Sequence, residues 1–341
     1  MRIFVLSIIV ENVYGKKKHP LKLEKAEPKK QIGFLRKLTQ DGKGKYNVYK
    51  PFNSIVVCIL FVKIFEKQEV LFCENGGQNM YHMRKSRVLQ KMKEGKVATC
   101  TKLNLSDPRA AEIAAMCGFD CLWIDLEHVP NSMTCVEDAV RAAKAYDVDV
   151  LTRVSKGCYS DLCRPLEADS AGVMVPHLMS LKEAKEIVYY TKFHPVGRRP
   201  IDGGNADGKY CLVDAKDYIR EANEERFVVV QIEDPEPMAE LEEICALPGI
   251  DMIFFGPADF AQGIGDPSGK DQKIDEARRL VAATARKHGK FAGTVGGPAN
   301  FDALVDMGYT FISTGADVVA LFTYFQDIAQ KVQNRDIKEV N

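Results

Sequence analysis

The sequence predicts an α/β protein in which eight parallel strands close into a (β/α)8 TIM barrel. From Ser86 onward, short apolar runs alternate with amphipathic helical patterns. This alternation extends over roughly 250 residues, the usual size of such a barrel. Polar residues follow the apolar runs, and in a parallel barrel these strand ends meet at one face. An open, doubly wound sheet is the alternative, but no Gly-x-Gly-x-x-Gly motif follows the first strand.

The totals for the chain exclude several classes of protein. The chain has 341 residues, and its 47 basic and 47 acidic side chains leave no formal net charge. Nothing therefore indicates a nucleic acid or an anionic membrane as a partner. The ten cysteines form no Cys-x-x-Cys pair. Their scattered positions suit a reducing compartment, and we predict a cytoplasmic protein.

Residues 1–79 differ from the rest of the chain. Lysine and proline are frequent there, and no helical or strand periodicity persists. The apolar run of residues 54–62 is too short to span a bilayer. We predict that residues 1–79 are a leader outside the folded domain, either disordered or translated from a misassigned start upstream of Met80 or Met83. The barrel domain is predicted to occupy residues 83–335.

Each predicted strand is a short run rich in β-branched, aliphatic and aromatic side chains. Strands of a parallel barrel are buried on both faces, so continuous apolar runs are expected rather than alternation. In chain order the predicted strands are Val97–Lys102, Cys121–Ile124, Val148–Val154, Gly172–Val175, Phe227–Ile232, Met252–Phe255, Phe291–Thr294 and Phe311–Ser313.

The predicted helices lie between these runs, and their apolar residues recur at the spacing of one helix face. Ser106 and Ser180 stand where N-caps are expected, and Gly118 and Gly289 where C-caps are expected. In chain order the predicted helices are Pro108–Met116, Val136–Tyr146, Ser160–Ala168, Leu181–Thr191, Met238–Ala246, Glu276–His288, Asn300–Met307 and Val318–Val332.

Two consecutive strands each end in an acidic residue. The run that ends at Ile232 is followed by Glu233, and the run that ends at Phe255 is followed by Gly-Pro-Ala and Asp259. Two carboxylates at neighbouring strand ends can hold one divalent cation and leave its other positions to water and substrate. The alternative is that both acids are helix N-caps, a role in which Asp is more common than Glu.

Other strand ends carry polar groups as well. The second strand is followed by Asp125, Glu127 and His128, the third ends in Arg153, and the fourth leads to His177. Taken alone, Asp125 could be a cap, Arg153 a surface ion pair and His177 a partly buried structural histidine. Their convergence on one face favours an active site.

These motifs resemble the HpcH/HpaI family of metal-dependent class II pyruvate aldolases, which includes the 4-hydroxy-2-oxo-acid aldolases. The similarity rests on Asp-Leu-Glu-His at 125–128, Arg153, Val-Met-Val-Pro at 173–176, Gln-Ile-Glu at 231–233 and Gly-Pro-Ala-Asp at 256–259. The resemblance implies a barrel of the phosphoenolpyruvate/pyruvate-binding type. It also implies that the last helix is exchanged between subunits of a homo-oligomer, usually a hexamer built as a trimer of dimers.

The resemblance assigns the metal and substrate ligands by position. Glu233 and Asp259 would bind the divalent metal ion, which is Mg²⁺, Mn²⁺ or Co²⁺. Arg153 and Gln231 would hold the pyruvyl oxygens. The backbone of Gly256, Pro257 and Ala258 would receive the pyruvate carboxylate.

The resemblance also assigns the acid–base groups. His128, oriented by Asp125, would shuttle protons through a water held at the metal. Glu167 stands where the family usually has an aspartate that reaches the site of a neighbouring subunit. Residues 195–208 depart from the family pattern, and we expect this loop to cover the site and to select the aldehyde.

The implied reaction is the reversible retro-aldol cleavage of a 4-hydroxy-2-oxo acid to pyruvate and an aldehyde through a metal-stabilised pyruvate enolate. The alternatives are a decarboxylase or carbon–carbon bond-forming enzyme that uses the same enolate, and a barrel that binds an oxo acid without catalysis. The strand ends considered above carry no lysine, which argues against a Schiff-base mechanism.

Overall fold

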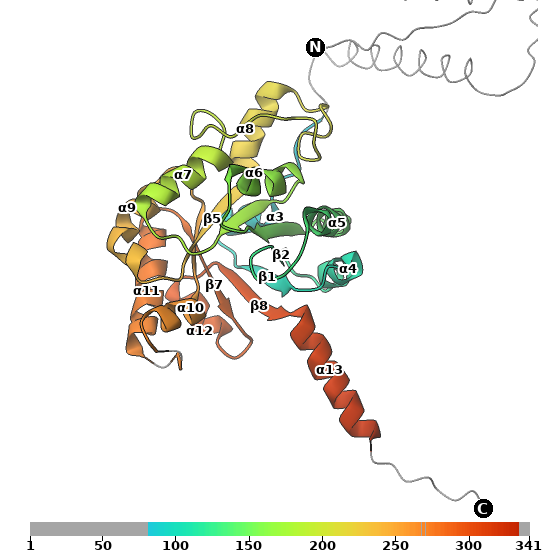
Figure 1. Cartoon of the computed structure of the whole chain (residues 1–341), viewed down its shortest axis with the longest axis vertical. Coiled ribbons are helices and arrows are strands. Elements are labelled where there is room, and N and C mark those ends of the chain that lie inside the picture. Colours follow the sequence, from blue (N-terminus) through green and yellow to red (C-terminus); the bar gives the residue numbers. More distant parts are fainter. Residues whose placement is uncertain (1–80, 267, 270, 334–341) are drawn as a thin grey trace, which may run out of the picture. The chain divides into compact units, whose positions relative to one another are not determined.

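The computed structural model describes residues 81–266, 268–269 and 271–333, and within them eight parallel strands form a closed barrel in sequence order (Figure 1). The strands are β1 (Ala98–Leu103), β2 (Cys121–Asp125), β3 (Asp149–Arg153), β4 (Gly172–Val175), β5 (Phe227–Ile232), β6 (Met252–Phe255), β7 (Phe291–Gly296) and β8 (Phe311–Ala316). The predicted barrel is confirmed, and the open sheet is excluded because β8 pairs with β1. The predicted leader, residues 1–79, lies outside the described residues.

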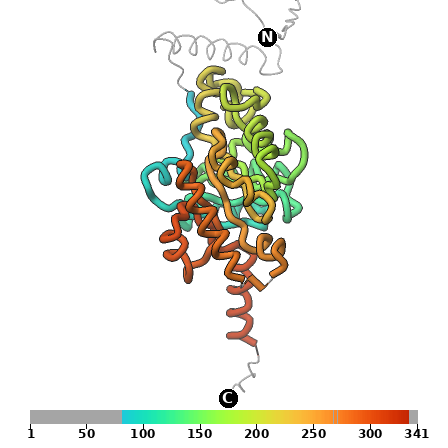
Figure 2. Tube along the Cα trace, turned by 90° about the vertical axis from the view of Figure 1, so that its left-hand side faces the viewer, coloured from blue at the N-terminus to red at the C-terminus, as the bar shows by residue number. Residues whose placement is uncertain are grey.

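Most of the helices connect the strands and cover the outside of the barrel (Figure 2), whereas the first precedes β1 and the last follows β8. They are α3 (Arg87–Lys93), α4 (Pro108–Met116), α5 (Met133–Lys144), α6 (Tyr159–Glu167), α7 (Leu181–Thr191), α8 (Ala215–Glu225), the 3-10 helix η1 (Glu236–Glu240), α9 (Leu241–Ala246), α10 (Pro257–Gly263), α11 (Gln272–Lys287), α12 (Phe301–Met307) and α13 (Asp317–Val332). All the predicted helices are present, although the fifth of them is divided into η1 and α9.

Three helices among the described residues were not predicted, namely α3, α8 and α10. The sequence of α8 is AKDYIREANEE, so only Tyr218, Ile219 and two alanines indicate an apolar face. Helices α3 and α10 have seven residues each. Two turns are too short for a reliable helical period.

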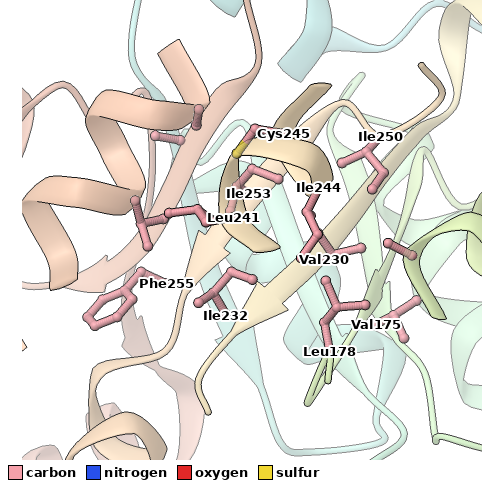
Figure 3. Packing of buried hydrophobic residues seen from close by; sticks show 14 of the residues in the cluster. Val175, Leu178, Val230, Ile232, Leu241, Ile244, Cys245, Ile250, Ile253 and Phe255 are labelled. Atoms are coloured by element: carbon pink, nitrogen blue, oxygen red, sulfur yellow. The ribbon is translucent and has the colours of Figure 1, made fainter. Parts of the chain in front are cut away.

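Apolar side chains hold the barrel together on both of its faces. On the outside, Val230 and Ile253 point from the strands toward Ile244 of α9 (Figure 3). On the inside, the ring of Phe254 makes edge contacts with Trp123 and Phe311 at centroid distances of 5.8 and 6.4 Å. Burial of both strand faces accounts for the continuous apolar runs in the sequence.

The loop at residues 195–208 lies at the N-terminal end of the barrel. It follows α7, which runs antiparallel to the strands and therefore ends where they begin. Its neighbours Phe193 and Tyr218 pack with Met83, which precedes β1. The expectation that this loop covers the site is therefore wrong within one chain, because the polar strand ends lie at the opposite end.

Helix α13 extends away from the barrel (Figure 1), and none of its residues is buried. Its exposed apolar residues are Val318, Val319, Leu321, Phe322, Tyr324, Phe325, Ile328 and Val332. No helix of the described chain is both long and apolar enough to cross a lipid bilayer.

A buried carboxylate, that of Asp149 at the start of β3, anchors the segment that precedes β1. It accepts hydrogen bonds from Ser86 Oγ at 2.6 Å and from the Val88 backbone N–H at 2.9 Å. Its other oxygen pairs with Arg84. A fully buried charge is tolerated only with such a complete set of donors.

Replacing Asp149 with alanine is expected to lower the free energy of unfolding by about 3 kcal/mol, because Arg84 and the Ser86 hydroxyl lose a buried partner. The matched control is Asp147→Ala, since Asp147 binds the same Arg84 at 2.8 Å but its side chain is 77% exposed. Urea denaturation should show a much smaller loss for Asp147→Ala. Equal losses would contradict the role given to Asp149.

Candidate active site

The side chains of Asp125 and Arg153 form a buried ion pair at the C-terminal ends of β2 and β3. The two residues are register partners in the sheet. Arg153 Nε donates to Asp125 Oδ1 at 2.9 Å, and one terminal nitrogen donates to Oδ2 at 2.5 Å. Burial alone would raise the pKa of Asp125, but the hydrogen bonds from Arg153 and Lys102 lower it below its ordinary value. The pair therefore stays charged and fixes the guanidinium in one orientation.

Glu127, which follows β2, connects this pair with two imidazoles. One of its oxygens lies 3.0 Å from Arg153 Nη1 and 3.6 Å from His128 Nε2. Its other oxygen lies 3.6 Å from His177 Nε2. We expected Asp125 to orient His128. In the structure, the carboxylate nearest the half-exposed ring of His128 belongs to Glu127 instead.

Glu233 lies just after β5, two strands along the barrel from β3, and His177 lies between it and Glu127. Its side chain is 1% exposed, and its oxygens accept hydrogen bonds from Gln231 Nε2 at 2.6 Å and from the His177 backbone N–H at 2.8 Å. Burial, together with the nearby charges of Asp259 and Glu127, raises the pKa of Glu233 to about 7. These acids therefore form a region of mutual repulsion that a cation would relieve.

Gly256 allows Glu233 to approach the start of α10. A Cβ atom at Gly256 would lie 2.5 Å from Glu233 Oε2 and 3.4 Å from Gln231 Nε2. The first distance is too short for any side chain, so glycine is required for this close approach. The same turn carries exposed Asp259 in the first turn of α10.

The donor set around Glu233 fits a divalent metal ion. Glu233 and Asp259 offer hard carboxylate oxygens, and the buried amide oxygen of Gln231 has no hydrogen-bond donor among the described residues. No group of three or more His, Cys, Asp or Glu side chains in the described chain could hold a metal. Two protein carboxylates leave most positions of a hard cation to water and substrate, as Mg²⁺ commonly requires.

His177 has a larger part in the site than the sequence suggested. Its backbone has φ of +48°, a left-handed conformation that is uncommon for residues other than glycine. Its Nδ1 lies 2.9 Å from Asp234 Oδ2. Burial lowers the pKa of His177, but Asp234, Glu233 and Glu127 raise it above its ordinary value overall. Asp234 was not predicted, although it directly follows the Gln-Ile-Glu motif.

Lys102 is a second residue of the site that was not predicted from the sequence. It lies near the C-terminal end of β1, and its Nζ is 2.7 Å from Asp125 Oδ2. The ammonium is 5.4 Å from the centroid of the Trp123 ring. The site therefore contains a lysine, contrary to the expectation from the other strand ends. Its position at the end of the first predicted strand could have identified Lys102 as a site residue.

Within this chain, Glu167 does not lie beside the other predicted site residues. It is the last residue of α6, and this end of the helix lies at the N-terminal end of the barrel. Its backbone oxygen accepts a hydrogen bond from the Asp207 N–H at 3.3 Å. Burial raises the pKa of Glu167 above its ordinary value, although the nearby charge of Arg199 opposes this shift. Its predicted role would need the site of a neighbouring subunit.

Comparisons with known proteins agree with this fold and identify the family of the chain. The family model described as HpcH/HpaI aldolase/citrate lyase matches residues 102–323. A hydroxypyruvate/pyruvate aldolase from Cupriavidus necator is 34% identical over 224 residues, which cover 64% of this chain and 81% of that protein. A 5-keto-4-deoxy-D-glucarate aldolase from Klebsiella pneumoniae is 28% identical over 66% of this chain and 88% of that protein.

A solved structure shows the same fold. The crystal structure of an HpcH/HpaI aldolase from Desulfitobacterium hafniense superposes with a TM-score of 0.69 at 26% sequence identity, covering 74% of this chain and 98% of that one. The match of the family model extends from Lys102 in β1 to the middle of α13 and includes every strand end described above. The chain therefore belongs to the HpcH/HpaI aldolase/citrate lyase family.

Proposed function

We propose that this protein cleaves a 4-hydroxy-2-oxo acid reversibly into pyruvate and an aldehyde, with a divalent metal ion as cofactor. Membership of the family makes the chain an enzyme of the carbon–carbon lyase class, and the proposal concerns its reaction. The observation that carries it is the buried Asp125–Arg153 pair facing the acidic half of the site at Glu233 and Asp259. In this proposal the fixed cation and the metal-binding acids would contact the same end of the substrate.

Arg153 would bind and polarise the pyruvyl end of the substrate. Its guanidinium is preorganised by Asp125 and Glu127, so little reorganisation is needed when negative charge develops on the 2-oxo oxygen. Gln231 would orient the same end through its amide. The backbone of residues 256–258 would receive the carboxylate, where Gly256 leaves space for a close approach.

Glu233 and Asp259 would hold the metal ion, which is Mg²⁺, Mn²⁺ or Co²⁺. When bound, such an ion supplies Lewis-acid polarisation of the 2-oxo group. Gln231 and the His177 N–H hold the Glu233 carboxylate in place for this role, as outer partners of metal ligands commonly do.

His128 would remove the proton of the 4-hydroxyl group. Its half-exposed imidazole beside Glu127 can exchange protons with solvent, and a neighbouring carboxylate favours the orientation of the ring. In this proposal Glu127, rather than Asp125, orients His128, and Asp125 acts by holding Arg153. Glu167 would act only in the site of a second subunit.

Two other functions remain to be separated from this one. A barrel that binds an oxo acid without catalysis would not exchange the methyl protons of pyruvate with heavy water, whereas an enzyme that enolises pyruvate would. A decarboxylase or carbon–carbon bond-forming enzyme would also exchange them. Aldehydes offered together with pyruvate would distinguish an aldolase from these enzymes, because only an aldolase forms the 4-hydroxy-2-oxo acid.

We further propose that the protein works in the cytoplasm. The cysteines among the described residues are all free thiols, as expected in a reducing compartment. Cell fractionation tests this assignment.

Glu233→Ala and Asp259→Ala are each expected to abolish metal-dependent exchange of the pyruvate methyl protons, because each removes half of the carboxylate pair. Circular dichroism should show a folded barrel in both variants, since both residues lie at strand ends. Asp234→Ala serves as the control on the same loop and should retain measurable exchange. Full activity of either metal-site variant after chelation would disprove the metal assignment.

His128→Ala is expected to slow aldol cleavage by roughly 10²–10⁴-fold, the usual contribution of a positioned acid–base group. Pyruvate affinity should change little, because Arg153, Gln231 and Glu233 remain. Single-turnover cleavage and pyruvate binding, measured on the same folded preparation, check this prediction. Unchanged cleavage with weaker pyruvate binding would make His128 a substrate ligand instead.

We also propose that α13 packs against a second copy of the chain, in a hexameric homo-oligomer in which this helix is exchanged between subunits. The support is the apolar surface of α13, which a monomer would leave in water. Replacing both Phe322 and Phe325 with serine should shift the protein to smaller species in sedimentation velocity experiments. Gln326→Ser is the control on the same helix, and an unchanged mass in the double variant would refute this contact.

A further inference from the structure

His177 combines a strained backbone with contacts to the segments that follow β3 and β5. Its φ of +48° lies in the left-handed region, which is costly for a residue with a side chain and persists only where surrounding contacts maintain it. The angle φ sets the direction of a side chain relative to the N–H of the same residue. At His177 this value lets the N–H reach Glu233 while the imidazole reaches Asp234.

Two contacts hold His177 in this conformation. Its ring atom Nδ1 lies 2.9 Å from Asp234 Oδ2, and the ring donates this hydrogen bond because an ionised carboxylate only accepts. Its backbone oxygen accepts a hydrogen bond from Lys156 Nζ, and the same ammonium pairs with Glu183 at 2.8 Å. The left-handed conformation is therefore supported both from the loop after β3 and from the segment after β5.

The backbone N–H of His177 helps to orient the carboxylate of Glu233. It donates to Oε1 at 2.8 Å, while Gln231 Nε2 donates to Oε2 at 2.6 Å. One donor on each oxygen fixes the plane of the carboxylate and leaves a lone pair on each oxygen for a cation. Asp259 and Glu127 repel this carboxylate. Without the N–H, that repulsion would act on a group held from one side only.

We propose that His177 is a positioning residue for the metal site, in which the hydrogen bond from its imidazole to Asp234 maintains the left-handed backbone that presents its N–H to Glu233. The inference rests on the proposed metal-dependent reaction and adds to it a residue that contacts neither the metal nor the substrate. The metal site requires the backbone conformation of residue 177 rather than an imidazole. Glycine at this position should therefore serve better than alanine, because glycine adopts φ > 0 without strain.

Binding of Mn²⁺ to the substrate-free enzyme tests this proposal, with free Mn²⁺ measured by electron paramagnetic resonance. His177→Ala should raise the Kd for Mn²⁺ by roughly 10–100-fold, the usual loss when an outer partner of a metal ligand is removed. His177→Gly should recover most of this affinity, although it removes more of the side chain. A mere loss of packing would instead weaken the glycine variant at least as much.

Asp234→Ala removes the partner of the ring and should raise the Kd for Mn²⁺ by about tenfold, the lower end of the same range. Both metal-binding carboxylates remain in this variant, so exchange of the pyruvate methyl protons should persist at saturating metal. If His177→Ala does not fold, Asp234→Ala carries the comparison with His177→Gly, because it leaves residue 177 itself unchanged.

Asp147 is the matched control. Its φ of +55° is also left-handed, and it lies in the turn before β3, at the other end of the barrel. Asp147→Ala and Asp147→Gly should both leave the affinity for Mn²⁺ unchanged.

Three outcomes would overturn the inference. Wild-type affinity for Mn²⁺ in both His177→Ala and Asp234→Ala would show that the hydrogen bond between these residues does not support the metal site. An affinity of His177→Gly as low as that of His177→Ala would assign the effect to the imidazole rather than to the backbone. Unchanged affinity with loss of proton exchange in His177→Gly would make His177 an acid–base group. Absence of Mn²⁺ binding by the wild-type enzyme would instead refute the proposed metal-dependent reaction itself.

Discussion

The ion pair between Asp125 and Arg153 is the interaction on which the arrangement of the site depends. Both side chains are buried at the ends of adjacent strands. Removing either charge from water without its partner would cost a large free energy of desolvation. Their bidentate geometry fixes the guanidinium against the aromatic interior, with its carbon 4.8 Å from the centroid of the Trp123 ring. Lys102 and Glu127 then attach to this pair, one on each side. The strand register of the barrel thus determines the geometry of the site.

Much of the fold could be predicted because the buried strands of a parallel barrel produce a recognisable pattern of apolar runs in the sequence. Strands such as β5, with Val228, Val229 and Val230 in succession, must be apolar on both faces, and few other architectures require this pattern. The acid after each of β5 and β6 could be found for the same reason, since a strand end is easy to locate. Short or polar elements, such as α8 and α10, were missed because they bury too few side chains to show a period.

The contacts between site residues were less predictable than their identities. The sequence placed Asp125, Glu127, His128 and Arg153 at the correct strand ends, but it could not show that Asp125 pairs with Arg153 while Glu127 approaches both imidazoles. These choices depend on side-chain direction at the barrel mouth. The loop of residues 195–208 was misplaced for a related reason: glycine and asparagine indicate a loop, but only the direction of the preceding helix determines the end of the barrel at which it lies.

Trp123 is the single tryptophan of the chain, and it lies directly under the charged groups of the site. The guanidinium of Arg153 and the ammonium of Lys102 both approach its ring, and the edge contact with Phe254 holds the indole in place. The emission of an indole depends on the charges and polarity around it. Binding of an oxo acid beside Arg153 would alter that surrounding field, so the protein contains its own optical reporter for occupancy of the site, without any attached dye.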